Sequence, residues 1–429
     1  MTEATPKTSI FKSFSKNYWT VIVMEFFERG SYYGMMSILS VYMTDQLNFS
    51  KESVGVIKST IQPLLYILPI LSGAIGDRFG YRKTLTFAFL FLGLGYFLTS
   101  QTTEYAMVFA SLVIMAFGAG AFKPMISGTI ARETTEKNST LGFGIFYWSI
   151  NLGAFLFPLI LVPYIKNAFG WQYVMMASAI CTTAMLIPTY LIYKEPKKPE
   201  STKNLAEVLK GMVLVLTDFR FIGLIVIYSG FWILYFQMFD SVLWYVQKYV
   251  DASSLDSAVN GLFAVFGINL NWKFDVEHVT VINAGTIILL QIIVSNIVKN
   301  KKALPTMITG ITMGTIGMAV LAISTNIWVF MLGIMVFSIG EMTAHPKFIS
   351  YVGLIAPEDK KALYLGYSFL YGVLGSGIGG ILGANLYVHF VDNLNQPSLL
   401  WIIFSMIGVV TIIGLLLYNK YLAPKSKNV

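Results

Sequence analysis

Three charged residues lie in the first half of an apolar stretch that is long enough to cross a membrane. The stretch is residues 18–43, YWTVIVMEFFERGSYYGMMSILSVYM, and the charges are Glu25, Glu28 and Arg29. On a helix these residues share a stripe roughly 100° wide with Met36. An ionised side chain at bilayer depth costs at least ~2.5 kcal/mol, so such residues face a bundle interior or a wet cavity. We therefore expect this helix to line a polar space.

Two further charges, Lys123 and Glu341, fall within later apolar stretches. If Lys123 meets the first three charges, two acids face two bases, and this offsets the cost of burial. Glu341 then leaves one negative charge in excess, so a proton that binds and leaves can change which ion pairs form. We place only Glu25, Glu28 and Glu341 as carboxylates deep within spans. A purely structural network is the alternative, because buried ion pairs sometimes only fix helix register.

Other chemistry is not indicated by the sequence. His278, His345 and His389 have no metal-ligand spacing, and we interpret them as loop or helix-end residues. The single cysteine, Cys181, lies in an apolar run, and we expect its thiol to pack against neighbouring side chains. There is no Ser-His-Asp order, phosphate loop or HExxH motif. We expect no enzyme, metal or cofactor, since the rival class, an intramembrane enzyme or receptor, would need a catalytic cluster or signalling domain.

The composition is that of an integral membrane protein. Of 429 residues, 55% are hydrophobic and 12% charged, whereas soluble domains have about 25% charged residues. Apolar segments of about 20 residues suit helices across a ~30 Å hydrocarbon core, and the alternation typical of barrels is not seen. The net charge of +8 is spread over one set of loops, so we attribute it to topology and expect no nucleic-acid partner.

Twelve apolar runs predict an all-α protein with two bundles of six spanning helices. The bundles are residues 1–193 and 221–429, and residues 194–220 form a polar, proline-bearing linker that ends in an amphipathic stretch. Most Lys and Arg residues fall in the tails and even-numbered loops, so both termini are expected on the cytoplasmic side. We expect a multi-pass monomer in the bilayer of the cell membrane, with no cleavable signal. The predicted spans are 18–43, 54–75, 84–101, 104–129, 140–165, 172–193, 221–246, 278–298, 303–323, 327–353, 362–389 and 398–419.

The two halves also resemble each other. MAFGAGAFKPMIS (115–127) in the fourth span aligns, with a short insertion, with MVFSIGEMTAHPKFIS (335–350) in the tenth. Parallel repeats of six helices suit the rocking of two bundles about a site at the midplane. Helix packing alone would also favour small residues at these positions, so the repeat does not by itself show transport.

The segment GAIGDRFGYRK, residues 73–83, follows the second span. It resembles the cytoplasmic loop motif of the major facilitator superfamily, with the spacing GxxxDRxGxRK. The resemblance implies that the Asp pairs with basic groups to hold one conformation and releases them in another. The alternative is positive-inside charge with a turn. The motif residues are Gly73, Asp77, Arg78, Gly80 and Arg82.

The first span carries a more specific motif. EFFERGSYYG (25–34) resembles the ExxERxxYYG signature of the proton-coupled oligopeptide transporters, a branch of that superfamily. Four further pieces agree in order, so the resemblance covers nearly the whole chain. They are GAGAFKP (118–124) for GxGxxKP, FYWSIN (146–151) for FYxxIN, FWILYFQ (231–237) for FWxxFEQ and GEMTAHP (340–346) for GExxxxP.

This resemblance implies roles for individual residues. Proton movement would be coupled to gating by Glu25, Glu28, Arg29 and Lys123. The substrate amino group would be held by Asn151, Asn283 and Glu341, although INA at 282–284 replaces the usual Asn-Pro. Amphipathic aromatic side chains suit a substrate cavity, but packing or an interfacial belt is the alternative for each. The candidate substrate-binding residues are Tyr32, Tyr66, Lys123, Asn151, Asn283 and Glu341, and Tyr147 and Trp232 are further aromatic candidates.

The sequence departs from the family at two positions that matter for specificity. The family usually has an Arg at Met36, where it helps to bind a peptide carboxylate, so that cation is absent here. The usual carboxylate of the seventh span is replaced by Phe236. Asp240 lies one turn outward; we interpret it as an interfacial residue, and substitution for the missing carboxylate is the alternative.

These observations predict the major facilitator fold and proton-driven uptake by alternating access. The expected substrates are di- and tripeptides or related amine-bearing solutes, with the proton gradient as driving force and no cofactor. The alternative, suggested by Met36, is the same fold moving an amino acid, amine or drug.

Overall fold

The computed structural model describes residues 13–136, 138–196 and 205–423. The polar segment before residue 13 and residues 197–204 of the predicted linker 194–220 lie outside the described residues. The chain is helical throughout the described spans, as predicted. The first helices are α1 (Lys16–Val41), α2 (Lys51–Phe79), α3 (Tyr81–Gln101), α4 (Tyr105–Glu133), α5 (Ser139–Leu156), α6 (Val162–Ala168), α7 (Gln172–Ala184) and α8 (Leu186–Leu191).

The second half repeats this plan. The linker contains α9 (Leu205–Leu216), which agrees with the predicted amphipathic stretch. The later helices are α10 (Phe219–Phe236), α11 (Ser241–Tyr249), α12 (Ser253–Val265), α13 (His278–Val298), α14 (Ala303–Val320), α15 (Ile327–Ile355), α16 (Lys361–Tyr367), α17 (Leu370–Tyr387) and α18 (Pro397–Tyr421). Three π-helical segments extend or join helices, namely Tyr42–Gln46, Phe157–Leu161 and Val388–Asn393, and two short 3₁₀ segments are Gln237–Phe239 and Glu358–Lys360.

Eleven helical stretches of the described chain are long and apolar enough to cross a membrane. Helix α1 is the twelfth long helix, with 26 residues. It falls short of the same criterion because every window of 18 residues within it contains Glu25, Glu28 and Arg29. The predicted count of twelve spans therefore agrees with the structure once the charged helix is included.

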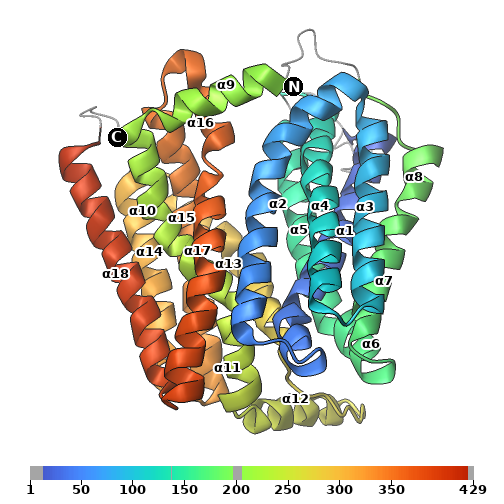
Figure 1. Ribbon diagram of the computed structural model, residues 1–429, viewed down its shortest axis with the longest axis vertical. Coiled ribbons are helices and arrows are strands. Elements are labelled where there is room, and N and C mark those ends of the chain that lie inside the picture. Colours follow the sequence, from blue (N-terminus) through green and yellow to red (C-terminus); the bar gives the residue numbers. More distant parts are fainter. Residues whose placement is uncertain (1–12, 137, 197–204, 424–429) are drawn as a thin grey trace, which may run out of the picture.

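The helices stand side by side in two groups (Figure 1). Helices α1 to α8 form the first group, and α10, α11 and α13 to α18 form the second. We call the end at which α9 crosses between the groups the termini end, and the opposite end, at which α12 lies across the molecule, the α12 end. The groups meet mainly where α2 packs on α17 and α5 packs on α13. The domain limits at residues 193 and 221 stay a prediction.

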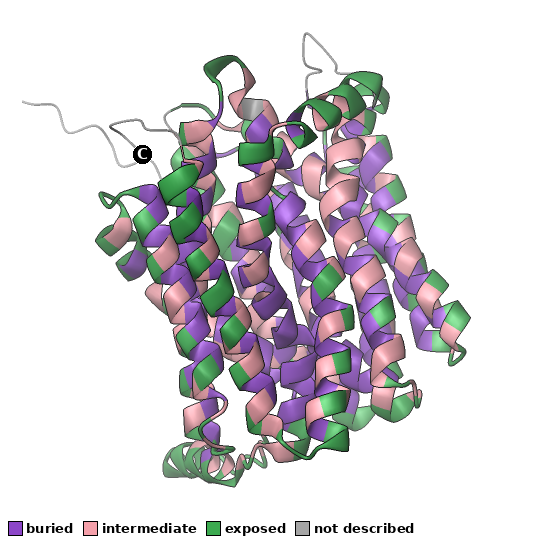
Figure 2. Cartoon of the chain, turned by 60° about the vertical axis from the view of Figure 1, so that its left-hand side comes forward, coloured by how far each residue is buried: buried purple, intermediate pink, exposed green. Residues whose placement is uncertain are grey.

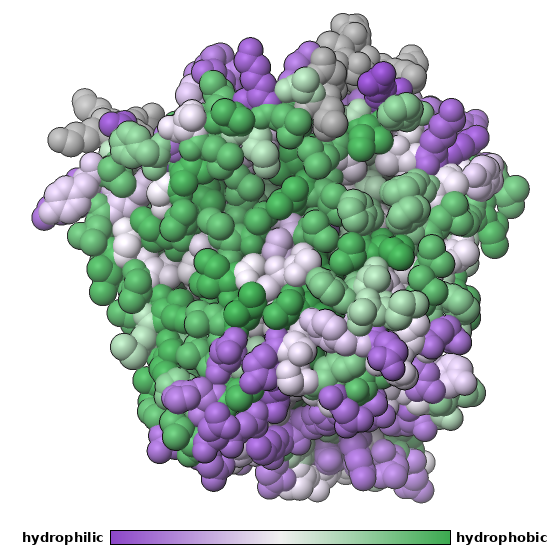
Figure 3. Space-filling view, viewed as in Figure 1, coloured by the Kyte–Doolittle hydropathy of each residue, from purple (hydrophilic) through white to green (hydrophobic). Residues whose placement is uncertain are grey.

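Apolar side chains surround the middle of the molecule. Figure 3 shows a hydrophobic belt between two hydrophilic ends, and Figure 2 shows exposed residues on the outward faces of the helices and buried residues between them. On α13, Leu289 and Ile292 are 76% and 74% exposed. Such residues are stable at the surface when the surrounding solvent is lipid.

The sequence explains several helix ends and close approaches. Ser50 caps α2 by accepting a hydrogen bond from the backbone N–H of Ser53 at 3.1 Å. Gly80, between α2 and α3, has φ +101°, a conformation that glycine adopts readily, so the predicted tight turn is confirmed. At the α12 end, a Cβ on Gly55 of α2 would lie 2.7 Å from Ala384 Cβ of α17. The two helix groups are therefore in backbone contact there.

The two spans that aligned as repeats are equivalent helices. Both α4 and α15 have 29 residues, and each contains one interior proline, Pro124 or Pro346. Lys123 immediately precedes the first proline, and Glu341 lies five residues before the second. The repeat therefore places the candidate cation and the candidate acid on corresponding helices of opposite groups.

Candidate functional site

A cavity of about 740 Å³ is lined by α2 and α4 of the first group and by α16 of the second, and it reaches α9 at the termini end. Tyr66 and Lys123 line its inner part, and Asp77 lines its outer part. Glu207 and Val208 of α9 lie at the mouth. The remaining lining residues come from α2, α4, α16 and the residues next to it, and are Leu65, Pro69, Ile70, Ala74, Pro124, Ser127, Arg132, Leu363, Gly366, Tyr367 and Phe369.

The charged stripe of α1 is assembled as predicted. Arg29 Nε lies 2.5 Å from Glu28 Oε2 and 3.6 Å from Glu25 Oε1, and a second guanidinium nitrogen donates to Glu28 Oε1 at 2.6 Å. The guanidinium carbon is 5.0 Å from the centre of the Tyr32 ring. Glu28 is fully buried, and Glu25 and Arg29 are 3% and 5% exposed. Two acids thus share one buried cation, which leaves this cluster with a negative charge.

Lys123 does not complete an ion pair with this cluster. Its ammonium lies 5.5 Å from the centre of the Tyr66 ring, and no ion pair within 4 Å joins it to a carboxylate in the described part of the chain. Lys123 nonetheless lies within electrostatic range of Arg29, Glu28 and Glu25. The predicted meeting of four charges is therefore realised for three of them, while the fourth faces the cavity over an aromatic ring.

The predicted amine site is divided between facing helices. Asn283 of α13 donates hydrogen bonds to Ser338 Oγ at 2.9 Å and to Glu341 Oε2 at 3.1 Å, both on α15. Asn151 of α5 donates to the backbone carbonyl of Tyr147 at 2.9 Å. Helices α5 and α13 pack against each other. Asn283 and Glu341 are thus brought together, and Asn151 lies on the facing helix with no hydrogen bond to either of them.

Tyrosine side chains from both groups lie around Glu341. Tyr66 and Tyr147 were predicted as cavity residues, and both are close enough to feel the charge of Glu341. Tyr33 and Tyr235, which were not predicted, share this environment. Phenolic hydroxyl groups on aromatic rings suit a solute that is partly apolar and partly hydrogen-bonding.

The interpretation of His345 as a loop or helix-end residue is wrong. His345 lies in the middle of α15, one turn beyond Glu341. Its ring centre is 5.4 Å from that of Trp232 and 5.7 Å from that of Tyr371, and its Nδ1 is buried without a hydrogen-bond partner among the described residues. Its position four residues after Glu341, within the same apolar run, places both residues on one helix face and is the sequence signal for its burial. His278 and His389 do lie near helix ends.

The interpretation of Asp240 as an interfacial residue is also wrong. Asp240 is 2% exposed, and its Oδ1 lies 3.0 Å from Nζ of Lys58, which is fully buried on α2. The same oxygen accepts a hydrogen bond from Ser40 of α1 at 2.8 Å. Asp240 is therefore a further buried carboxylate, and it joins the two helix groups. Lys58 was overlooked, although a lone lysine in an apolar run carries the same signal as Glu25.

A cation also lies beside Met36, where the sequence predicted none. Lys58 Nζ is 3.9 Å from Met36 Sδ, and it donates a hydrogen bond to the carbonyl of Phe239 at 3.2 Å. The positive charge comes from α2 instead of α1. Because Lys58 is paired with Asp240, it serves the junction between the groups in this conformation.

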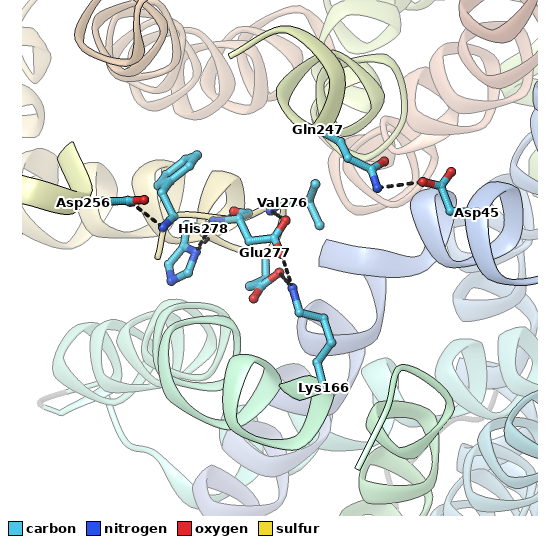
Figure 4. A network of polar contacts seen from close by, with 9 residues as sticks. Asp45, Lys166, Gln247, Asp256, Val276, Glu277 and His278 are labelled. Atoms are coloured by element: carbon cyan, nitrogen blue, oxygen red, sulfur yellow. Dashed lines mark hydrogen bonds and ion pairs between the residues drawn. The ribbon is translucent and has the colours of Figure 1, made fainter. Parts of the chain in front are cut away.

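The α12 end is closed by further polar contacts between the groups. Lys166 of α6 reaches Asp275 Oδ2 at 2.6 Å and Glu277 Oε2 at 2.7 Å, just before α13 (Figure 4). At the same end, Gln247 donates to Asp45 at 2.7 Å (Figure 4), and other contacts include Lys51 with Asp392 at 2.7 Å. The molecule is thus shut at the α12 end and hollow at the termini end.

The loop motif makes the kind of ion pair that the resemblance implied. Asp77 pairs with Arg132 of α4 at 2.8 Å and accepts a hydrogen bond from the Tyr81 hydroxyl at 3.1 Å. The guanidinium of Arg82 donates to the carbonyl of Tyr193. The remaining motif residues make no comparable contact: Arg78 lies 5.4 Å from the ring centre of Phe79, a Cβ on Gly73 would touch only Pro124, and Gly80 forms the turn.

Comparison with known families identifies one description that matches nearly the whole chain. Residues 21–275 and 269–429 match the Major Facilitator Superfamily. Dipeptide and tripeptide permease B of Photorhabdus asymbiotica is 31% identical over 213 residues, which are 46% of this chain and 43% of that protein. The protein of that name from Shigella dysenteriae is 24% identical over 459 residues, 92% of either chain. The first of these matches thus spans less than half the length of the relative.

Solved structures share the fold. A crystal structure of a peptide transporter POT in complex with sulfate has a TM-score of 0.77 at 20% identity, covering 97% of this chain and 96% of that one. A POT family transporter in complex with 5-aminolevulinic acid has a TM-score of 0.74 at 22% identity, covering 97% and 100%. These structures confirm the predicted fold, and the relatives named dipeptide and tripeptide permease confirm the predicted resemblance to peptide transporters.

Proposed function

Because the chain belongs to the Major Facilitator Superfamily, we propose that it is a proton-coupled importer of di- and tripeptides or related amine-bearing solutes. One observation carries this proposal. A buried, net acidic cluster on α1 and a second acid, Glu341, lie within electrostatic range of Lys123 and Tyr66, which line a cavity that is open at the termini end. Such an arrangement supports alternating access, in which protonation changes the ion pairs that hold the two groups together.

The amino group of the substrate would bind in the second group. Glu341 has no cationic partner within 4 Å among the described residues, and it accepts a hydrogen bond from the Asn283 amide. A carboxylate and an amide oxygen are acceptors that suit a primary ammonium ion. The relatives named dipeptide and tripeptide permease support this choice of substrate class.

The conformation would be the inward-facing one. The positive-inside rule assigns the termini end to the cytoplasm, and the cavity lies at that end. The opposite end is closed by Lys58 with Asp240 and by Lys166 with Asp275 and Glu277. Release of these contacts would be required before substrate enters from outside. We further propose that the protein works as a monomer in the cell membrane with both termini cytoplasmic.

A second candidate is transport of amines that lack a free carboxylate. It is favoured by Met36, which leaves α1 without a cation at that position, and by the commitment of Lys58 to Asp240. One structural neighbour is in complex with 5-aminolevulinic acid, which is not a peptide. Lys123 then remains as a cation in the inner part of the cavity, while Arg132, which also lines the cavity, pairs with Asp77.

Reconstituted protein tests the proposal. Proteoliposomes that are acidic outside should accumulate a labelled dipeptide, and a protonophore should abolish the accumulation. Glu341→Gln should bind the dipeptide poorly and lose its accumulation. Glu358 is an exposed carboxylate at the termini end, so Glu358→Gln should behave as wild type. Equal uptake without a proton gradient, or uptake driven by sodium, contradicts the coupling. A thermal-shift screen with dipeptides, amino acids and amines separates the two substrate classes.

A further inference from the structure

A second hollow lies on the outside of the first helix group. It has a volume of about 470 Å³ and runs between α2 and α3, with α4 as its floor. Helices α2 and α3 both pack closely on α4, which leaves the space between them open. The lining residues are Leu68, Leu71, Ser72, Ile75, Phe79, Lys83, Thr84, Phe87, Phe117 and Ala121.

This groove and the central cavity lie on opposite faces of α2. The cavity is lined by Tyr66, Ile70 and Asp77, and the groove by Leu68 and Ile75. At about 100° per residue these sets point in roughly opposite directions. The groove therefore faces away from the junction of the two groups, toward the surroundings of the molecule.

The rim of the groove is apolar and exposed. Ile75, Phe79 and Phe87 are 43%, 58% and 42% exposed, and Phe117 of α4 is 42% exposed. These residues belong to helices that cross the membrane. The groove thus opens into lipid, and aromatic side chains form its walls.

One end of the groove carries unpaired positive charge. Lys83 lines the groove at the termini end, and no hydrogen bond or ion pair joins it to another described residue. Arg78 lies against the Phe79 ring at 5.4 Å and likewise has no carboxylate partner in the described chain. Their neighbour Arg82 is engaged by the carbonyl of Tyr193. Two cations are therefore available where the groove meets the membrane surface.

We propose that this groove binds one acyl chain of an anionic phospholipid, with the phosphate at Lys83 and Arg78. From Leu68 to Phe79 is 11 residues, or about 16 Å of helix, which matches one leaflet of a hydrocarbon core about 30 Å thick. A ligand that fits this site therefore has both an apolar chain of that length and a negatively charged headgroup. The proposal depends on the membrane embedding of α2 to α4 and is independent of the transported solute.

The site adjoins the loop motif. Asp77, on the inner face of the same turn of α2, pairs with Arg132. A lipid bound on the outer face at Phe79 and Lys83 stabilises the α2–α3 corner in the conformation that makes this ion pair. The lipid composition of one leaflet would therefore influence how often the α2–α3 corner adopts the conformation in which Asp77 pairs with Arg132.

Native mass spectrometry of the purified full chain tests the site. Phosphatidylglycerol should bind with higher affinity than phosphatidylcholine of the same chain length. Lys83→Ala should weaken phosphatidylglycerol binding about fivefold, as expected for one cation at an anionic headgroup. Lys301→Ala, an exposed lysine that is also predicted on the cytoplasmic side, is the matched control and should change nothing. Glycerophosphoglycerol, which has no acyl chains, should not compete.

Two variants test the acyl chain. Ala121→Phe should fill the floor and weaken phosphatidylglycerol binding, and Phe117→Ser, on the exposed rim, should act in the same direction if the first variant does not fold. The proposal is overturned if Lys83→Ala and Lys301→Ala bind alike, if phosphatidylcholine binds as well as phosphatidylglycerol, or if glycerophosphoglycerol competes. Unchanged binding in a folded variant with the filled groove would likewise refute it.

Discussion

Replacing Lys166 by methionine should open the α12 end of the protein. Lys166 supplies the cation for Glu277, which is 1% exposed, and for Asp275, whose side chain is 44% exposed. Methionine keeps the apolar length of the side chain but leaves the Glu277 carboxylate buried without a cation. Removing one partner of a buried pair typically costs about 3–5 kcal/mol, and here the cost falls on the state in which the α12 end is closed.

Protonation of Glu277 sets an upper limit on this free-energy cost. A buried glutamate can take up a proton instead of staying ionised, and protonating a glutamate of ordinary pKa, about 4.3, at pH 7 costs about 3.7 kcal/mol. We therefore expect a loss of about 3 kcal/mol at pH 7, which shifts the equilibrium between closed and open states about 100-fold. At pH 5 the same upper limit falls to about 1 kcal/mol, or about fivefold.

The pH dependence follows from the direction of the Glu277 shift. Burial raises the pKa of Glu277 above its ordinary value, although Lys166 opposes the shift. Because the closed state then binds the proton more tightly than an open, solvated state, acid favours closure through this group. The other polar groups around it are Lys166, Asp275 and His278, whose Nδ1 accepts a hydrogen bond from the Asp275 N–H at 3.0 Å. Lys166→Met should thus open at neutral pH and close again as the pH falls.

Distances between spin labels measure this opening. Labels at Gln101→Cys in the first group and Ser257→Cys on α12 would report separation of the groups, in a Cys181→Ala background. Lys166→Met should add a population at longer distance at pH 7. The double variant Lys166→Met with Glu277→Gln should remove that population, because it leaves no buried carboxylate at the α12 end without its cation. Asp275 also loses its partner, but its side chain is 44% exposed and stays solvated.

A matched substitution separates the effect from general loss of charge. Lys248 pairs with Asp392 at 3.4 Å within the second group and is 53% exposed, so Lys248→Met should leave the distances unchanged. The reasoning is refuted if Lys166→Met shows the wild-type distances at pH 7, or if its opening grows on acidification.

Three further predictions concern the junction and the cavity. Lys58→Met should impair uptake more than the double variant with Asp240→Asn in a proteoliposome assay, since a lone buried charge costs more than none, and equal impairment would contradict the pairing. Gly55→Val should prevent closure at the α12 end, because even a Cβ would lie 2.7 Å from that of Ala384, and label distances should show it open. Lys123→Ala should abolish proton-driven accumulation while sparing exchange; accumulation at the wild-type rate would exclude the assigned role.

Most of the fold was predictable from the sequence because lipid imposes a simple rule on it. Spans must be apolar, helical and about 20 residues long, so their limits follow from composition. The predicted limits 327–353 and the observed helix Ile327–Ile355 differ by two residues at one end. Asn283 and Glu341 could be assigned to one site because motif residues in two spans pointed to it, and the structure places them 3.1 Å apart.

The contacts between the two groups could not be predicted in the same way. Lys58 and Asp240 lie 182 positions apart, and only the packing of α2 against the second group brings them together. Lys166 directly follows the predicted span 140–165, where a lysine is expected at the membrane surface, so nothing in the sequence distinguishes it from a surface lysine. Helical periodicity assigns a residue to a face of its own helix but not to a partner across an interface.

The charges of the interior, counted together, link the substrate to the proton. Lys166, Glu277 and Lys347 are buried near the two ends of the molecule, where Lys166 pairs with Glu277 and Lys347 donates to the carbonyls of Lys299 and Lys301. Between these ends, three cations face four carboxylates: Arg29, Lys58 and Lys123 against Glu25, Glu28, Asp240 and Glu341. The charges of Lys58 and Asp240 cancel. The net charge of the seven residues is therefore −1, which is the net charge of the five residues that remain when this pair is left out. A zwitterionic peptide brings no net charge, so a proton must accompany it to neutralise the interior, whereas an amine without a carboxylate supplies that positive charge itself. We therefore expect uptake of an amidated peptide to depend less on the proton gradient than uptake of the free peptide. Equal dependence of the two would show that the excess carboxylate is not where the amine binds.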